Sequence, residues 1–313
     1  MPEHTDPAVA AGTAAASAAT IPVAEILMAE AATGEFKRKG LGWGFWAGAV
    51  WLGVLITTLL LVPVLPIDDP NQVTGELYKS PSSAHWFGTD ELGRDMFARV
   101  LWGGRPSISI GVTALVLGFM IGGLIGLTAG FFRGLYERAT MAVMDIMLAF
   151  PSLILALALI SLLSEPGTQE GSFGKIVTVL TILAIPALAR ITRANTLVYS
   201  QREFVLAARS LGAKPGRILR REILPNVVPS MLSFSFIALA ILIVAEGALA
   251  FLGLSVEAPS VTWGKLIAGG YTDLDKAPYL TFFPCLFLFL TLLSLNHIGD
   301  KLQAKFSVRE AQT

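Results

Sequence analysis

Long apolar segments separated by shorter polar ones set the pattern of this chain. At a rise of 1.5 Å per residue, about 20 apolar residues span the roughly 30 Å hydrocarbon core of a bilayer. Segments of that length lie at residues 43–65, 107–131, 139–163, 176–199, 227–254 and 279–298. The pattern therefore predicts six transmembrane helices.

Composition and charge narrow the class of protein. Hydrophobic residues make up 54% of the chain and charged residues only 15%, outside the range of soluble globular domains. Because 23 basic residues balance 23 acidic ones, no net field points to a nucleic-acid partner. The single cysteine, Cys285, has no second thiol to pair with, and the three histidines lie far apart, so we expect neither a disulfide nor a metal site. We expect an all-α integral membrane protein.

The placement of Lys and Arg predicts how the chain crosses the membrane. Cytoplasmic loops retain positive charge, whereas translocated loops tend to lack it. With the N-terminus inside, 16 of the 23 basic residues fall on the inner face and the other seven on the outer face. This distribution predicts that both termini are cytoplasmic.

Two outer loops are longer than simple connectors. In residues 66–106, Thr89, Asp90 and Glu91 predict the capped start of a short helix on the membrane surface. Residues 255–278 are rich in Gly and Pro, and we expect Trp263 at the membrane interface. Either loop is suited to meet an extracellular binding protein, and a lid that only shields a pore is an equal alternative.

A polar segment at residues 203–226 separates the fourth and fifth apolar segments. Its first part favours a helix from Glu203, which Gly212 ends in the left-handed conformation. Pro215 suits the first turn of a second short helix, and Pro225 is expected to stop that helix. Such a basic helix-turn-helix is suited either to dock a cytosolic protein or to lie on anionic headgroups. The residues alone leave both alternatives open.

The same segment carries a family resemblance. Residues 207–212 (AARSLG), followed after eleven residues by Leu224 and Pro225, resemble the EAA loop of ABC importer permeases. The chain departs from that pattern at two places, with Leu206 in place of Glu and Glu222 in place of Ile.

Two further stretches narrow the resemblance to one branch. Residues 85–111 are similar to a signature that follows the first helix in C-type permease subunits of dipeptide and oligopeptide importers. Residues 246–267 look like the segment between the last two helices of those subunits. The ending ILPN of the EAA-like loop and a displaced acidic residue, Glu203, also resemble this branch.

The resemblance implies a type I ABC importer permease fold (MetI-like core), with a coupling helix that sits in a groove of a separate ATPase subunit. It assigns to this contact Glu203, Ala207, Ala208, Gly212, Leu224 and Pro225. The implied partners are a second homologous permease that completes a heterodimeric pore, two ATP-binding subunits or domains, and an extracytoplasmic substrate-binding protein. The implied location is a bacterial inner membrane.

The resemblance also implies a domain map. It consists of a disordered tail at 1–36, a first transmembrane helix at 37–66, an extracytoplasmic loop with a short helix at 67–106, a permease core at 107–300 with its coupling loop at 201–226, and a cytoplasmic tail at 301–313.

The chain lacks a nucleotide-binding motif of its own. A phosphate-binding loop needs Gly, four residues, and then Gly-Lys followed by Ser or Thr. Gly174 and Lys175 are followed by Ile176, and Gln169 stands where the first Gly is needed. We therefore expect no cofactor on this chain, with ATP and Mg bound by the partner subunits, and we do not expect the chain itself to be an enzyme.

Charges within apolar segments are costly and tend to be functional. Arg190 and Arg193 are close enough to the inner end of the fourth segment to reach the headgroups. Asp145 is suited either to pair with one of these arginines or to line the path, and Glu246 either to hold a substrate ammonium or to pack against a helix. The candidate path residues are Asp145, Glu246 and Trp263.

Glycines and prolines predict how the helices pack. The second segment repeats Gly at four- and eight-residue steps, which lets a neighbouring helix approach closely. Pro151 and Pro186 are expected to kink the third and fourth helices.

The resemblance implies di- and oligopeptides as substrates, with nickel or another small solute as the alternative. A secondary transporter would show an internal repeat, and we find no convincing repeat among the six segments. An intramembrane hydrolase would need a catalytic pair at one depth, but Asp145 is the sole aspartate within the six segments.

Overall fold

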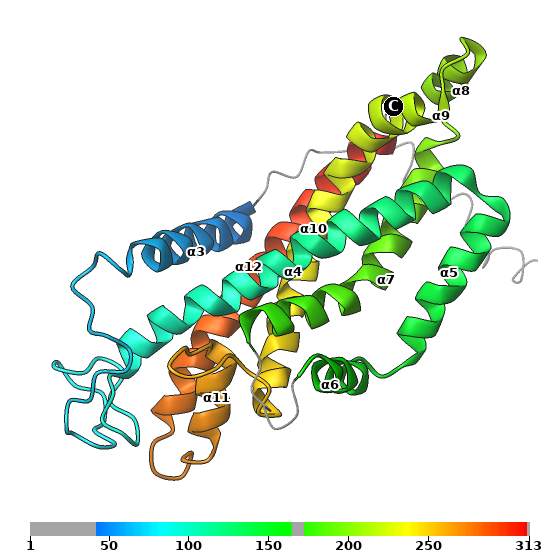
Figure 1. Ribbon diagram of the computed structural model, residues 1–313. Helices are drawn as coiled ribbons and strands as arrows, with labels where there is room; N and C mark the ends of the chain where they lie inside the picture. Colours follow the sequence, from blue (N-terminus) through cyan, green and yellow to red (C-terminus); the bar gives the residue numbers. More distant parts are fainter. Residues whose placement is uncertain (1–41, 165–171, 312–313) are drawn as a thin grey trace, which may run out of the picture. The chain divides into compact units, whose positions relative to one another are not determined.

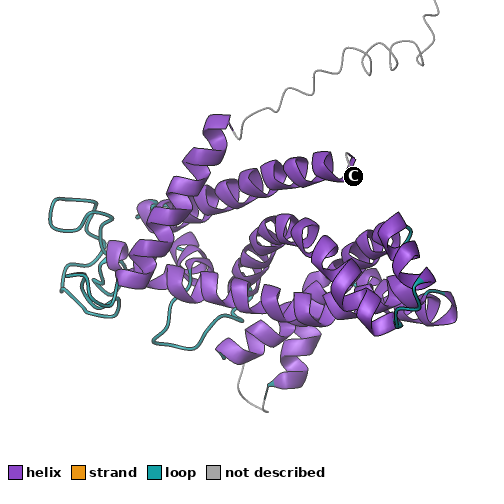
Figure 2. Ribbon diagram, turned by 90° about the horizontal axis from the view of Figure 1, so that it is seen from above, coloured by secondary structure: helices purple, strands orange, loops and turns teal. Residues whose placement is uncertain are grey.

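A computed structural model describes residues 42–164 and 172–311, and residues 43–313 belong to one compact unit. Over the described residues the chain forms helices and two isolated β-bridges, without a strand (Figures 1 and 2). The helices are α3 (Gly42–Leu61), α4 (Met96–Phe132), α5 (Gly134–Ala149), α6 (Ser152–Leu163), α7 (Phe173–Tyr199), α8 (Glu203–Ser210), α9 (Pro215–Ile218), η1 (Leu219–Ile223), α10 (Leu224–Phe251), α11 (Trp263–Tyr271) and α12 (Tyr279–Ala311). The tail predicted at 1–36 lies outside the described residues.

Five of the described helices are long and apolar enough to cross a membrane, or six if α5 and α6 form one bent span. The predicted single helix at 139–163 is therefore broken, with an angle of 96° between α5 and α6. The break falls at Pro151, which cannot donate to the preceding turn and which pushes Phe150 into an extended conformation. By contrast, Pro186 lies within α7, which continues past it.

Helix α4 begins at Met96, not after Glu91 as the sequence predicted. Its N-cap is Asp95, whose carboxylate accepts a hydrogen bond from the Ala98 N–H (2.9 Å). Two residues of the expected cap form hydrogen bonds within the loop instead. Thr89 Oγ1 donates to the Glu76 carbonyl, and the Asp90 carboxylate accepts from two backbone N–H groups of the following turn. The expected short surface helix is thus the first part of a long membrane helix.

Helices α4 and α7 make a close contact lined by glycine, as the spacing predicted. A Cβ added at Gly126 would lie 2.2 Å from the carbonyl oxygen of Ala189, and one at Gly122 would lie 2.7 Å from that of Ile185. Gly130 faces the Arg193 carbonyl in the same way, at 2.9 Å. Because the two backbones touch over several turns, any side chain at these positions would push the helices apart.

Buried side chains of α4, α7 and α10, such as Ile110, Leu180 and Leu242, form the largest apolar core. Helix α3 packs beside α12, where the Trp51 indole N–H donates to Thr291 Oγ1 at 3.3 Å.

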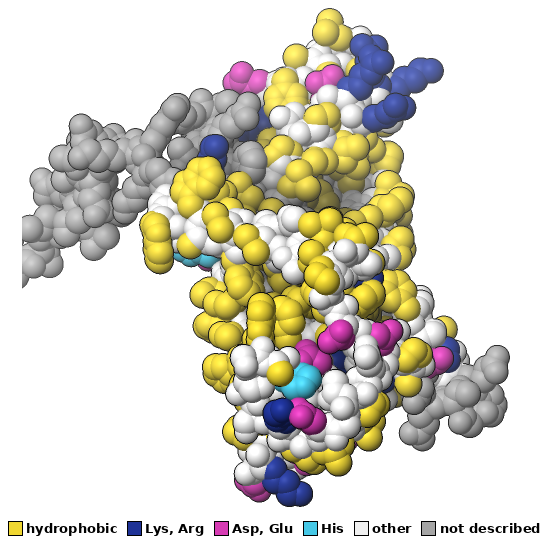
Figure 3. All heavy atoms as spheres, turned by 90° about the vertical axis from the view of Figure 1, so that its left-hand side faces the viewer, with side chains coloured by type: hydrophobic (Ala, Val, Ile, Leu, Met, Phe, Trp, Pro, Cys, Tyr) yellow, Lys and Arg dark blue, Asp and Glu magenta, His cyan; other side chains and the backbone are white. Residues whose placement is uncertain are grey.

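The described part of the chain has two polar ends. Helices α8 and α9 lie near the end of α12, whereas the 62–95 loop and α11 lie at the opposite end (Figure 1). On the face in Figure 3, hydrophobic side chains form a broad band, with Lys, Arg, Asp and Glu gathered above and below it. This distribution suits a protein whose middle is in hydrocarbon and whose ends are in water.

Candidate coupling loop and transmembrane charge sites

The polar segment forms the two short helices that the sequence predicted. Helix α8 begins at Glu203, and Gly212 follows it with a left-handed φ of 78°. The turn is held by hydrogen bonds from the Gly212 N–H to the Arg209 carbonyl (2.9 Å) and from the Ala213 N–H to the Ala208 carbonyl (3.0 Å). Pro215 then occupies the first turn of α9.

The predicted stop at Pro225 is wrong. Helix α9 continues through the π-helical turn η1 directly into α10, and Pro225 lies in the first turn of α10. The Leu224 N–H bonds to the Leu219 carbonyl, five residues back, which is the wider spacing of a π-turn. Pro225 has no N–H to donate, and its ring would crowd the carbonyl four residues back in a regular α-helix, so the wider turn just before it gives the ring room.

A buried apolar cluster attaches this segment to the membrane helices. Val205 of α8, Ile218 of α9, Ile223 of η1 and Val227 of α10 pack together with Leu127 of α4. The Arg209 guanidinium adds a contact over the Phe131 ring at 5.4 Å. This cluster therefore packs α8 together with residues of α4 and α10. Sequence reasoning missed this cluster, although the apolar spacing from Val205 to Ile223 was its signal.

The other side of α8 is open. Leu211 is 88% exposed, and Leu206 and Phe204 are also exposed on a segment that is otherwise polar. Of the two alanines in the motif, Ala207 is exposed and Ala208 is half-buried against the cluster.

The remaining motif residues, Glu203, Gly212, Leu224 and Pro225, are exposed. So are the basic side chains of Arg209, Lys214, Arg217, Arg220 and Arg221. The surface thus combines apolar side chains with positive charge.

Two ion pairs join α5 to α7 within the membrane-spanning part. Asp145 Oδ1 lies 2.5 Å from Arg190 Nη2, which settles which of the two arginines pairs with Asp145. Arg193 pairs with Glu137 instead, with 2.6 Å between its Nε and the carboxylate. Sequence reasoning missed Glu137, although its spacing of eight residues from Asp145 places both acids on one side of α5.

Glu246 and Trp263 meet at the start of α11. The Glu246 side chain is almost fully buried, and Ser107 Oγ of α4 lies 3.4 Å from its Oε2. The same hydroxyl accepts the backbone N–H of Trp263 at 3.0 Å. The Trp263 indole is fully buried and donates to the Val100 carbonyl (2.8 Å), so it lies inside the protein and not at the membrane interface where the sequence placed it.

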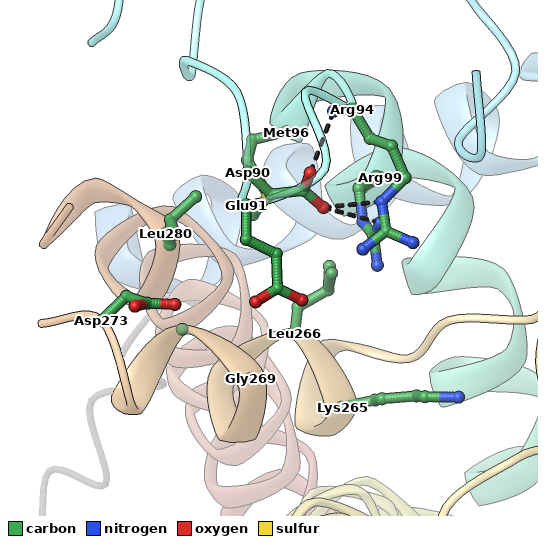
Figure 4. Close-up of a pocket in the computed structure, with 11 residues that line it drawn as sticks. Asp90, Glu91, Arg94, Met96, Arg99, Lys265, Leu266, Gly269, Asp273 and Leu280 are labelled. Carbon is green, nitrogen blue, oxygen red and sulfur yellow. Dashed lines mark hydrogen bonds and ion pairs between the residues drawn. The ribbon is translucent and has the colours of Figure 1, made fainter. Parts of the chain in front are cut away.

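A small pocket opens at the end opposite to α8, between the 62–95 loop and α11 (Figure 4). The Asp90 carboxylate holds both Arg94 (2.7 Å) and Arg99 (2.8 Å) at its edge. Glu91 and Lys265 also line it. This charged network ties the loop to the first turn of α4.

Two side chains near this pocket have shifted pKa values. A hydrogen bond from Lys79, at 2.5 Å, lowers the pKa of the Glu76 carboxyl. Burial, followed by the neighbouring Asp273, raises the pKa of the Tyr78 phenol. Asp273 also lines the pocket, so the loop approaches the turn after α11 here.

Among the described residues, no three His, Cys, Asp or Glu side chains gather as a metal site would require.

Several apolar helices long enough to span a membrane, with a polar helix-turn-helix packed at one end, indicate a multi-pass membrane protein. Residues 122–310 match the binding-protein-dependent transport system inner membrane components, and the chain belongs to this family. It is therefore a permease subunit of an ABC importer of the inner membrane. Systems of this kind pair a permease with ATPase and substrate-binding partners.

Relatives from bacteria are similar to this chain over most of their length. The chain is 35% identical to the glutathione transport system permease protein GsiD of Pectobacterium atrosepticum, over 91% of this chain and 94% of that protein. It is 39% identical to GsiD of Escherichia coli O157:H7, over 86% of each chain.

The fold has a solved counterpart. Two inward-facing crystal forms of the MetNI methionine ABC transporter contain a chain that matches with TM-scores of 0.55 and 0.57 at 20% identity. The match covers 67% of this chain and 96% or 97% of that chain, and it shows that the two share the type I permease fold.

Proposed function

We propose that the chain forms half of a translocation pore for peptide-like solutes and couples this pore to cytosolic ATPase subunits through α8 and its turn. The observation that carries the proposal is a helix with two opposed sides. Val205 fixes one side in the buried cluster, whereas Leu206 on α8 and Leu211 just after it are left exposed by the described residues. An exposed apolar side on a firmly attached helix suits a protein partner that pushes on it.

The proposed contact consists of Glu203, Ala207, Ala208, Gly212, Leu224 and Pro225, together with the exposed leucines. Small residues let a groove in the partner close around the helix, and the neighbouring basic side chains add charge complementarity with an acidic rim. Closure of the ATPase subunits on ATP would then move α8, and through the cluster α4 and α10, between inward- and outward-facing states. ATP and Mg are assigned to those partner subunits and no cofactor to this chain.

Peptide-like solutes are the proposed substrate class. The GsiD relatives are glutathione permeases by name, and glutathione is a tripeptide. We therefore place glutathione beside di- and oligopeptides as the first candidates. Nickel or another small solute remains the alternative, because specificity in such systems depends strongly on the separate binding protein.

The proposed assembly contains this chain, a second homologous permease, two ATP-binding subunits or domains and an extracytoplasmic binding protein. We assign both termini to the cytoplasm, so that α8 faces the ATPases and the outer pocket faces the binding protein. Glu246 and Trp263 are assigned to holding α11 at the outer mouth of the pore.

Reconstitution tests the transport proposal. The chain is placed in vesicles with its partner permease, its ATPase subunits and binding protein, and uptake of labelled glutathione, a dipeptide, a pentapeptide and nickel is measured. We expect ATP-dependent uptake of at least one of the three peptides. Uptake of nickel alone would overturn the substrate class, and transport by this polypeptide without ATPase subunits would overturn coupling altogether.

A matched pair of leucine variants tests the coupling surface. Leu211→Ser removes an exposed side chain from the proposed contact, and Leu135→Ser removes an equally exposed leucine at the start of α5. Loss of one buried leucine at an interface corresponds to a reduction in partner affinity of about tenfold or more. For Leu211→Ser only, we expect weaker binding of the ATPase subunits and loss of the stimulation of ATP hydrolysis by substrate. If the two variants behaved equally, α8 would not be part of the contact.

A further inference from the structure

The two ion pairs between α5 and α7 differ in their surroundings. In the Glu137–Arg193 pair the side chains are 16% and 34% exposed, as expected for a contact between packed helices. In the Asp145–Arg190 pair they are 56% and 52% exposed. The second pair therefore joins the same two helices but presents both of its charges outward.

The exposed pair lies near the middle of the membrane-spanning part. Asp145 follows Gly134, the first residue of α5, by eleven residues, or about 16 Å along the axis. Arg190 precedes Tyr199, the last residue of α7, by nine residues, or about 14 Å. Both helix ends are at the α8 end of the fold, since Arg133 Nη2 beside α5 donates to Ser200 Oγ beside α7 at 3.1 Å. Half of a hydrocarbon core is about 15 Å.

Charged side chains that are more than half exposed at this depth do not face lipid tails, because charges in hydrocarbon turn inward or toward water. Small residues lie one turn to either side of Arg190 on α7, at Ala187 and Ala194, and both are exposed. Being small, they add little side-chain bulk beside the pair. This part of α5 and α7 therefore suits the wall of a water-filled path.

We propose that Asp145 and Arg190 line the substrate path and bind the charged end groups of a zwitterionic, peptide-like substrate. The Asp145 carboxylate takes the substrate ammonium, and the Arg190 guanidinium takes a substrate carboxylate in its planar fork. This inference rests on the proposed substrate class and adds the site that recognises it.

The pairing between the two side chains suits passage through the path. A passing substrate exchanges one charge-assisted hydrogen bond for others, so each step is close to balanced in free energy. Transport requires sites that bind well enough for entry and weakly enough for exit. An isolated Asp or Arg at this depth would instead carry the full cost of an unpaired charge before substrate arrives.

Thiol labelling tests where the pair faces. In a Cys285→Ser background, Asp145→Cys and Val143→Cys are made in the full assembled transporter. Both positions are exposed in this chain, but two residues along a helix point about 160° apart. We expect a membrane-impermeant methanethiosulfonate to label Asp145→Cys and not Val143→Cys, and saturating substrate to slow labelling. An unlabelled Asp145→Cys would place the pair against lipid or the second permease and overturn the inference.

Selectivity tests what the pair binds. Uptake is compared for a peptide with free ends, its N-acetyl form and its C-amide. Relative to wild type, Asp145→Asn should lower the preference for the free amine, and Arg190→Gln that for the free carboxylate, each by about threefold or more. Glu137→Gln, which breaks the less exposed pair between the same helices, should leave both ratios unchanged.

The outcomes separate this inference from the proposed function. If wild type takes up peptides but the preferences for free over blocked ends do not change in the Asp145 and Arg190 variants, the inference is overturned and the proposed function stands. Equal changes in the Glu137 variant would reduce the exposed pair to a helix contact and overturn it as well. Absence of any peptide uptake by wild type would overturn the proposed substrate class, whereas the labelling result would still show whether the pair faces water.

Discussion

At the scale of single residues, the permease depends on positions where backbone meets backbone. The α4–α7 contact is closest at Gly126, where even a methyl group would overlap a carbonyl oxygen. A second constrained position is Ser107, whose side-chain hydroxyl donates to the carboxylate of Glu246 and accepts the N–H of Trp263. Both sites leave little freedom in residue type, for steric reasons in the first case and hydrogen bonding in the second.

Gly126→Ala is expected to destabilise the protein by about 2 kcal/mol, because the added Cβ forces α4 and α7 apart. Thermal unfolding of the purified protein in detergent measures this loss. Gly174→Ala, in α7 itself, is the control, since nothing lies within 4 Å of its added Cβ. Equal midpoints for the two variants would contradict the close contact.

Ser107→Ala is expected to cost about 2 kcal/mol, since it leaves a buried carboxylate and a buried N–H without their shared partner. The same thermal measurement applies, together with the rate of proteolysis in residues 252–262, which should rise as α11 loosens. Ser109→Ala provides the comparison, because that hydroxyl is exposed and bonds only within its own helix in the hydrogen bonds described. An unchanged unfolding midpoint for Ser107→Ala would contradict a stabilising role of this hydroxyl.

At the scale of elements, the polar segment at residues 203–226 shows what the sequence could and could not predict. Gly212 and Pro215 each act through their own backbone, so the turn between α8 and α9 follows from local chemistry. The predicted helix end at Pro225 was wrong because the effect of a proline depends on the turn before it. Here that turn is π-helical, and the helix continues past the proline. Membrane spans follow from length and hydropathy in the same local way.

Tertiary contacts explain the remaining differences. Asp95 caps α4 because Thr89 and Asp90 are already engaged with the loop. The choice of Arg190 as the partner of Asp145 depends on the register between α5 and α7, which helical periodicity within one segment does not define. The cluster around Val205 likewise needs five elements in place: α4, α8, α9, η1 and α10.

The turn between α8 and α9 gives a prediction at this scale. Gly212→Ala should lose about 1 kcal/mol, because its left-handed φ is strained for a residue with a Cβ. Gly212→Asn should lose less, since Asn tolerates this region better. Gly216→Ala, inside the next helix and with nothing within 4 Å of its Cβ, should be neutral or stabilising. Chemical or thermal unfolding ranks the three, and a different order would contradict the turn.

At the scale of the whole chain, the distribution of basic residues predicts the orientation. An alkaline phosphatase fused after Thr313 should be inactive and one inserted after Gln72 should be active, because the enzyme works only outside the cytoplasm. Fluorescent protein fusions at the same positions should give the opposite pattern. Phosphatase activity after Thr313 would reverse the orientation and place α8 on the wrong side for an ATPase.

The continuous helical run from Pro215 to Phe251 reaches from one polar end of the described fold to the other. Its 37 residues form a rod about 55 Å long that begins beside the exposed leucines and ends near Glu246 and α11. If the rod pivots near its centre by about 10°, its two tips swing about 5 Å in opposite directions. Such a rotation would open the channel at the α11 end while it narrows at the α8 end.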